Sequence, residues 1–298
     1  MSAWRIDTLK SKGLEKWIHR VNARIGSITG LIGIPASLIG AVFLFIYSGN
    51  EVLSPSIILI MKMFFLVHGL LFLLNFFILY FKGREIKVKE KEDVEEKLID
   101  YFKRTSRVSS KFILKNKIIF VLFITIIFFY FSFSVLQDAW QPYLTARLGF
   151  NLYWLGIASA LTSFFGFLIN IKSKDFTEWV GNYPSTLLIL TMFLGFSILI
   201  FAFMNPTYFV IVLYVVIITA YYFYRPIRGT YIHNQVPSKI RATIGSIDSF
   251  LIEISTGFGS LIIFGIVGEF FTLSFALKTG GIILIGSAVI YVYLIKEN

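Results

Sequence analysis

Eight long apolar stretches constrain this chain more than any other feature of its sequence. A bilayer core of roughly 30 Å requires about 20 apolar residues in a helix, and each stretch is close to that length. Polarity within them does not alternate as it does in the strands of a transmembrane barrel. The sequence therefore predicts an all-α, polytopic membrane bundle of about eight transmembrane helices. The stretches cover approximately residues 25–47, 56–81, 118–136, 152–171, 185–204, 208–224, 245–267 and 271–295.

Composition agrees with a bilayer environment and gives no sign of an enzyme. Hydrophobic residues make up 56% of the chain and charged residues 15%, whereas soluble domains are about 45–50% apolar and about 25% charged. The chain has no cysteine, which excludes disulfides, thiolate metal sites and a cysteine nucleophile. No His-Glu-x-x-His, Walker A or Gly-x-Ser-x-Gly sequence occurs. We expect no catalytic residue, no cofactor and no metal site.

Lys and Arg residues gather on one side of an eight-span topology. Of the 28 in the chain, 25 fall in the N-terminal segment, in residues 82–117, after the fourth stretch, between the sixth and the seventh, or at the C-terminus. Arg147 lies on the other side, and Lys62 and Lys278 lie inside stretches, where they can extend outward. Cytoplasmic loops favour Lys and Arg, so we expect a multi-pass protein of the cell membrane with both termini cytoplasmic. The net charge of +11 is thus a topology signal, and no nucleic-acid partner is expected.

The apolar stretches divide the chain into three segments. Residues 1–81 form a cytoplasmic N-terminal segment followed by two transmembrane helices, residues 82–117 a cytoplasmic linker, and residues 118–298 a unit of six transmembrane helices. The linker allows two interpretations, an amphipathic helix at the membrane surface or under the bundle, or a solvated helix. Its apolar residues recur at helical spacing, at Val94, Leu98, Tyr101, Phe102 and Val108.

The most distinctive sequence is RPIRGTYIHNQVPSKIRATIGSIDSF, residues 225–250. It leaves one span and begins the next. It contains the sequence Asn-x-x-Pro at Asn234 to Pro237 and the sequence Arg-Ala-Thr-x-x-Ser at Arg241 to Ser246. Pro237 cannot continue a helix from upstream, and Ser238 can cap a new one. We expect Arg241 to reach lipid phosphates or a carboxylate.

Two further stretches contain sequence motifs. The N-terminal sequence SAWRIDTLKSKG contains Ala-Trp-x-x-Asp-x-Leu-Lys-x-x-Gly, and LQDAWQPYLTARLGFNLYWLGIASA, residues 136–160, contains Gln141 and Pro142. Together with residues 225–250 they resemble the major facilitator superfamily. Residues 225–250 resemble the connection between family helices ten and eleven. The N-terminal sequence resembles the connection between helices four and five in drug-efflux-like members, and residues 136–160 resemble the end of helix seven and the start of helix eight.

This resemblance implies a truncated major facilitator fold in which the eight helices are family helices five to twelve. Residues 1–81 would then be the remnant of the N-terminal half, without its first four helices. The resemblance further implies secondary active transport of a small solute by alternating access, with proton-coupled efflux as the mode of transport. The implied partners are a small-molecule substrate, the lipid bilayer and a separate chain that supplies the missing helices. The alternative is a truncated or split membrane protein that transports nothing and acts as a helical partner of another chain.

Two acidic residues fall inside the seventh span. Charges within spans are costly, so each is a candidate functional residue. Glu253 lies near the middle of the membrane and is either a coupling carboxylate lining a cavity or a protonated group bonded to a neighbouring helix. Asp248 lies nearer the start of the span, where Arg241 and the helix dipole can hold it.

Other candidate residues lie at the outer end of the third span and inside the sixth. Asp138 and Gln141 are placed to bind or gate at the outer mouth, although an interfacial Asp is also commonly just solvated. Tyr214 is deep enough to face a substrate, and Tyr224 is expected in the aromatic belt at the cytoplasmic interface. In the first span, Gly33 belongs to a series of small residues that favours close helix packing. Gly26, Gly30 and Ser37 complete that series.

Overall fold

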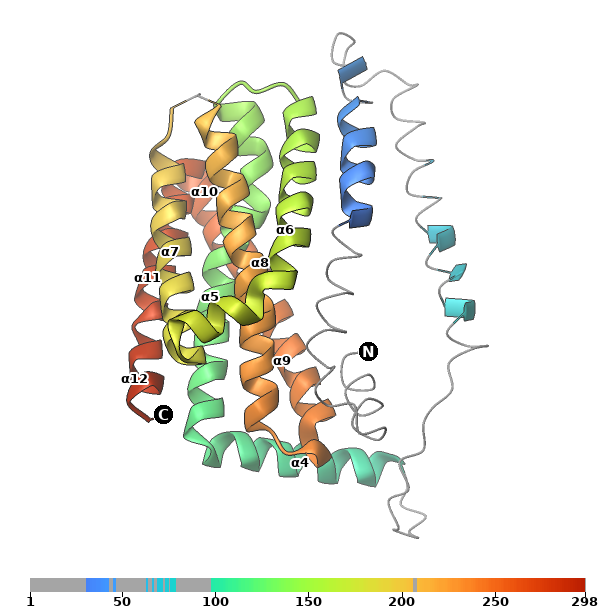
Figure 1. Cartoon of the computed structure of the whole chain (residues 1–298), viewed down its shortest axis with the longest axis vertical. Coiled ribbons are helices and arrows are strands. Elements are labelled where there is room, and N and C mark those ends of the chain that lie inside the picture. The colour runs from blue at the N-terminus through green and yellow to red at the C-terminus, as the bar shows by residue number, and fades with distance from the viewer. Residues whose placement is uncertain are drawn as a thin grey trace.

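The computed structural model describes residues 31–42, 45–46 and 98–297 apart from 206–207, together with positions 63, 66, 69–71, 73–74 and 76–78. Within these residues all regular secondary structure is helical, which confirms the predicted all-α class. Figure 1 shows long helices running side by side, with one helix, α4, lying across one end of the bundle.

The helices from residue 98 onward follow one another through short connections. They are α4 (Leu98–Lys115), α5 (Lys117–Pro142), η2 (Tyr143–Arg147), α6 (Tyr153–Val180), α7 (Tyr183–Phe203), α8 (Phe209–Gln235), α9 (Ser238–Gly259), η3 (Ser260–Val267), α10 (Gly268–Phe270), α11 (Leu273–Ala288) and α12 (Ile290–Glu297). The two η segments are π-helical turns that continue α5 and α9.

Five helical stretches in the described residues are long and apolar enough to cross a membrane. They match five of the eight predicted spans and cover Lys117–Arg147, Tyr183–Phe203, Phe209–Gln235, Ile240–Phe270 and Leu273–Lys296. The apolar part of α6, Tyr153–Ile169, is shorter. The two predicted spans before residue 82 are described only in part.

Local sequence signals set where several helices begin and end. Asn116 and Asn182 cap α5 and α7 by accepting hydrogen bonds from backbone N–H groups at 3.1 and 2.8 Å. Thr272 caps α11 in the same way at 3.1 Å. Gly181 ends α6 with a φ of 103°, a backbone conformation that side chains with a Cβ rarely adopt.

The outer surface of α7 shows why this bundle requires lipid. One face of the helix packs into the core, and the opposite face is equally apolar but exposed. In a soluble protein, the exposed face of such a helix would carry polar residues. The buried face consists of Leu187, Leu190, Leu194, Ile198 and Phe201, and the exposed face of Ile189, Phe193, Phe196 and Ile200.

Glycines allow the central helices to cross closely. Gly195 of α7 and Gly281 of α11 face each other, so that a Cβ built on either would lie 3.1 Å from the carbonyl oxygen of the other. At Gly259 in α9, an added Cβ would overlap the carbonyl oxygen of Phe131 in α5. The backbones therefore meet where no side chain intervenes.

A helix at Leu31–Val42 packs against α6 through small residues. A Cβ built on Gly33 would lie 2.8 Å from the hydroxyl oxygen of Ser163, and one built on Gly156 would lie 2.6 Å from the Cβ of Ala41. Gly33 thus packs as predicted, whereas Gly26 and Gly30 lie outside the described residues. Ala41 is the only described residue between 31 and 78 that is buried.

The described part of the predicted linker forms α4, which lies under the bundle and contacts α9 and α5. Ser109 is fully buried, and Phe112 and Ile113 are partly buried against the core. Arg107 and Lys111 on its other face are exposed. These contacts favour the helix under the bundle over the solvated linker, while the three-segment division of the chain stays a prediction.

Three helices extend beyond their predicted ends. The span predicted at 118–136 continues as α5 and η2 to Arg147, the one at 152–171 as α6 to Val180, and the one at 208–224 as α8 to Gln235. Each extension is polar, which is why hydropathy missed it. The helices end just before Gly149, Gly181 and Pro237. Pro142 and Pro226 lie within helical backbone and do not end it.

Candidate functional site

A buried ion pair joins α8 to α9. Arg228 donates from Nη1 and Nη2 to the two carboxylate oxygens of Asp248, at 2.8 and 3.0 Å. The side chains are only 7% and 16% exposed. This parallel two-bond geometry is the strongest that an arginine makes with a carboxylate. Asp248 is ten residues after Ser238, the first residue of α9. At a rise of about 1.5 Å per residue, the ion pair therefore lies about 15 Å along the helix.

Aromatic rings from α5 and α8 surround the pair. The guanidinium carbon of Arg228 lies 5.6 Å from the ring centroid of Tyr130. One turn earlier on α8, Tyr224 stacks on Phe129 with centroids 3.9 Å apart, and its hydroxyl lies 2.9 Å from that of Tyr291 in α12. A cation over an aromatic face in a dry site is attracted to the ring, so the aromatic cluster helps to hold the buried arginine.

The positions of these residues follow from helical spacing. Tyr221, Tyr224 and Arg228 are separated by three and four residues and therefore share one face of α8. On α5, Phe129 and Phe133 are four apart, and Phe133 stacks on Tyr221 at 4.5 Å. The Nε of Arg228 is buried without a hydrogen-bond partner in the described part of the chain. The pair is thus held rigidly from three helices.

Glu253 lies on the exposed face of α9. It is 15 residues from Ser238 and 17 from Phe270, the ends of the continuous helical stretch formed by α9, η3 and α10. Its neighbours on this face, Phe250, Ile254 and Phe258, are 63%, 40% and 55% exposed. The side chain makes no hydrogen bond with the described residues, so the alternative of a carboxyl bonded to a neighbouring helix finds no support there.

Asp138 and Gln141 lie in the last turns of α5, not beyond its end. Gln141 is exposed, and Asp138 is partly exposed. The Oδ2 atom of Asp138 is buried and accepts no hydrogen bond from the described residues. Pro142, four residues on, has no N–H to bond the Asp138 carbonyl. The role of both residues stays a prediction.

Two tyrosines of α8 are buried in aromatic stacks. Tyr214 is 6% exposed and stacks on Trp140 with ring centroids 4.4 Å apart. A role in facing substrate therefore requires the stack to open. Tyr224 has no exposed surface, so its predicted place in the interfacial belt is wrong. The sequence analysis took α8 to end at Tyr224, whereas the helix continues for three further turns.

The comparison with known families decides what this bundle is. The family model described as Major Facilitator Superfamily matches residues 19–260, which is most of the chain. This chain belongs to the Major Facilitator Superfamily. No curated protein and no solved structure gives a significant match.

Membership of the superfamily fixes the broad function. Its members are transporters and not enzymes, so the chain is a multi-pass membrane protein of a transporter family. A small-molecule substrate and a lipid environment follow from the same membership. The drug-efflux-like subtype and the numbering of the helices are not settled by this match and stay predictions.

The superfamily motif at residues 225–250 is mostly helical, contrary to the loop that we expected. Asn234 is exposed in the last turn of α8, and Pro237 precedes α9 as its N-terminal cap position. Ser238 is the first residue of α9 and makes no capping bond, so its predicted role is wrong. Pro237 separates α8 from α9, since it has no N–H to continue the hydrogen bonding of α8.

Arg241 has a different partner from the predicted one. It is 8% exposed, and its Nη2 donates to the backbone carbonyl of Val236 at 3.0 Å. Asp248 is bound by Arg228, so the expectation that Arg241 holds Asp248 is wrong. The physical reason is that α8 continues past Tyr224. Arg228 therefore lies within the bundle, where it reaches Asp248 of α9. The three-and-four spacing of Tyr221, Tyr224 and Arg228 is the sequence signal that could have revealed this pair.

Proposed function

We propose that this chain carries out secondary active, proton-coupled efflux of a small solute and that Glu253 is the coupling carboxylate. The position of Glu253 supports this proposal most directly, because it is an exposed acid near the middle of a membrane-spanning helical stretch. An ionised carboxylate at the bilayer centre is unfavourable by about 2.5–3.5 kcal/mol on insertion scales. Proton uptake by Glu253 would remove that cost, and proton release would restore it.

The carboxyl group of Glu253 favours a cavity over a lipid-facing position. The same face of α9 carries large apolar residues, yet a glutamate in contact with lipid would give no advantage over leucine. A water-filled cavity between two halves of a transporter explains both the acid and the exposed surface. Protonation of Glu253 would then bias the equilibrium between the inward-open and outward-open states.

The buried pair of Arg228 and Asp248 supports the proposal in a second way. It ties α8 to α9, so the helix that carries Glu253 would move together with α8 as one body. A rigid body of this kind is what alternating access by rocking requires. We propose that both chain termini face the cytoplasm and that a separate chain supplies the first four family helices opposite the exposed face of α9.

Transport in proteoliposomes tests this function. The protein, with and without a co-expressed four-helix segment from a related transporter, is reconstituted and screened with fluorescent and radiolabelled small solutes under an imposed pH gradient. For a solute that moves, Glu253→Gln should reduce gradient-driven transport at least tenfold and leave counterflow exchange largely intact, because Gln keeps the shape and cannot ionise.

The matched control is Glu269→Gln, since Glu269 is an exposed acid in α10 near the end of the same helical stretch. This variant should transport like the wild type. If pH-driven transport persists unchanged in Glu253→Gln, Glu253 is not the coupling residue. If no solute moves in any combination, the result agrees with the alternative of a non-transporting helical partner and not with the proposed transport.

A further inference from the structure

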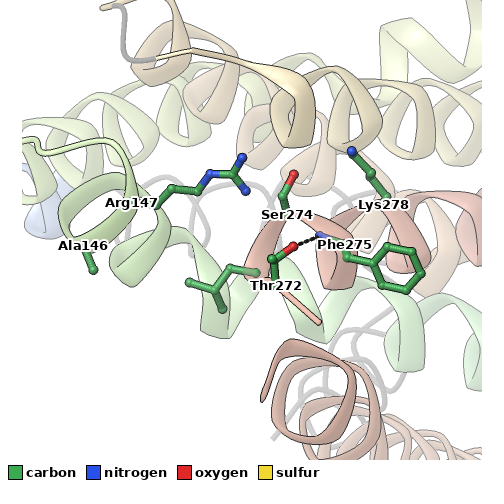
Figure 2. Close-up of a pocket in the computed structure, with 7 residues that line it drawn as sticks. Ala146, Arg147, Thr272, Ser274, Phe275 and Lys278 are labelled. Carbon is green, nitrogen blue, oxygen red and sulfur yellow. Dashed lines mark hydrogen bonds between the residues drawn. The ribbon is translucent and has the colours of Figure 1, made fainter. Parts of the chain in front are cut away.

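A pocket opens at the end of the bundle opposite α4, between η2 and the start of α11. It has a volume of about 530 Å³ and is lined by residues from these two segments only. Figure 2 shows Arg147 and Lys278 on either side of Ser274, with the guanidinium of Arg147 directed toward the pocket. The lining residues are Ala146, Arg147, Thr272, Leu273, Ser274, Phe275 and Lys278.

Among the described residues, neither cation of this pocket has an acidic partner. No carboxylate among the described residues lies within ion-pair distance of Arg147 or Lys278, and none lines the pocket. Two positive charges in one pocket repel each other, and the repulsion is relieved when an anion binds between them. Lys278 is expected from the sequence to extend outward, and it lies with Arg147 in the lining of this pocket.

Aromatic rings hold the two cations in place. The Nζ of Lys278 lies 3.9 Å from the ring centroid of Phe203, and the guanidinium carbon of Arg147 lies 5.1 Å from that of Tyr143. Tyr143 is itself anchored by its hydroxyl, which donates toward the carbonyl oxygens of Phe201 and Ala202 at 3.1 Å. Cations that are already positioned lose less conformational freedom when they bind a ligand.

The hydroxyl groups of the pocket add a donor. Thr272 Oγ1 accepts the hydrogen bond from the backbone N–H of Phe275, which leaves its own O–H free to donate. Ser274 donates to the carbonyl oxygen of Ala202 at 2.5 Å and so has no proton to offer a ligand. The available donors are therefore an arginine fork, an ammonium group and one hydroxyl.

We propose that this pocket binds a phosphate group carried by a larger molecule, either a phospholipid headgroup or a phosphorylated solute. A phosphate has enough oxygens to meet the arginine, the lysine and the threonine together, and Arg pairs with it through two parallel bonds. The pocket is open to the outside, which leaves room for the rest of a larger molecule. Phe271 and Phe275, stacked at 4.8 Å and 64% and 46% exposed, offer an apolar surface beside the pocket.

Binding to the purified full chain in detergent tests this proposal without requiring transport. One arm measures retention of phosphatidylglycerol by native mass spectrometry, and the other titrates inorganic phosphate and glycerol 3-phosphate by calorimetry. Binding of phosphatidylglycerol alone identifies a lipid site, and binding of glycerol 3-phosphate identifies a solute site. Binding of inorganic phosphate alone would contradict a larger carrier molecule. The Arg147→Gln/Lys278→Gln variant should weaken binding by at least tenfold, as expected for the loss of charge-assisted hydrogen bonds.

The matched control is Arg107→Gln/Lys111→Gln, which removes two exposed cations of α4 at the other end of the bundle. It should bind as the wild type does, and Arg147→Lys/Lys278→Arg should retain most of the affinity because it keeps both charges. If the double Gln variant does not elute as a monodisperse protein, Arg147→Gln alone decides, because that side chain is exposed. The proposal is overturned if the wild type binds none of the probes, or if removing these cations weakens binding no more than the α4 control does.

Discussion

At the scale of single residues, Arg228 and Asp248 are the most consequential pair in the described structure. Two charges buried in a bundle are favourable only together, since desolvation costs several kcal/mol per ion and each ion is compensated by the other. The aromatic cluster around Arg228 adds to that compensation without replacing the carboxylate. The pair should therefore tolerate the removal of both charges better than the removal of one.

We expect Asp248→Asn to lower the free energy of unfolding by about 3–5 kcal/mol, because it leaves Arg228 buried without a counter-charge. The Arg228→Met/Asp248→Leu double variant should recover most of this loss. Denaturant unfolding in detergent micelles measures both, with Glu269→Gln as a surface control that should change the free energy by less than about 0.5 kcal/mol. A double variant as unstable as the single one would show that the charges are not the reason for the pairing.

At the scale of helices, the close crossing of α9 and α5 depends on the absence of a side chain at Gly259. A glycine inside a helix otherwise reduces stability by about 0.5–1 kcal/mol relative to alanine. The contact with the Phe131 carbonyl explains why glycine is nonetheless found there. Gly257, two residues earlier in the same helix, has no neighbouring atom within 4 Å of the position that an added Cβ would take, and it provides a direct comparison.

We expect Gly259→Ala to reduce stability by about 1–3 kcal/mol, since the added methyl group must separate two backbones. Gly257→Ala should be neutral or slightly stabilising, because it meets open space and improves helix propensity. Thermal unfolding of the two variants side by side in the same detergent distinguishes them. Equal melting temperatures would mean that α5 and α9 are not in backbone contact at Gly259.

At the scale of the whole molecule, the orientation in the membrane follows from the basic residues and can be tested directly. Lys111 on α4 and Asn151 between η2 and α6 are both exposed, and they lie near opposite ends of the bundle. The chain has no native cysteine, so each introduced cysteine is a unique label. In intact cells a membrane-impermeant maleimide should modify Asn151→Cys and spare Lys111→Cys. The reverse pattern would invert the proposed topology.

The sequence predicted the general architecture well because hydropathy and charge act on whole helices. It predicted the polar end of α8 poorly, because hydropathy averages cannot show that Arg228 finds a carboxylate on the next helix. The same limitation hid the place of Tyr224, which looks interfacial by position and is buried by packing. Glu253 stood out from the sequence because a single acid in an apolar run needs no partner to be noticed.

The length of α8 has a consequence for the membrane around the protein. Its 27 residues span about 40 Å, and Arg228 lies about 29 Å from Phe209, near the far boundary of a hydrocarbon layer of roughly 30 Å. In lipids with longer acyl chains the polar end of α8 would lie partly in hydrocarbon, whereas in shorter-chain lipids it would lie among the headgroups. We therefore expect the position of the polar end of α8 to depend on bilayer thickness, through tilt of the helix or local adjustment of the lipid.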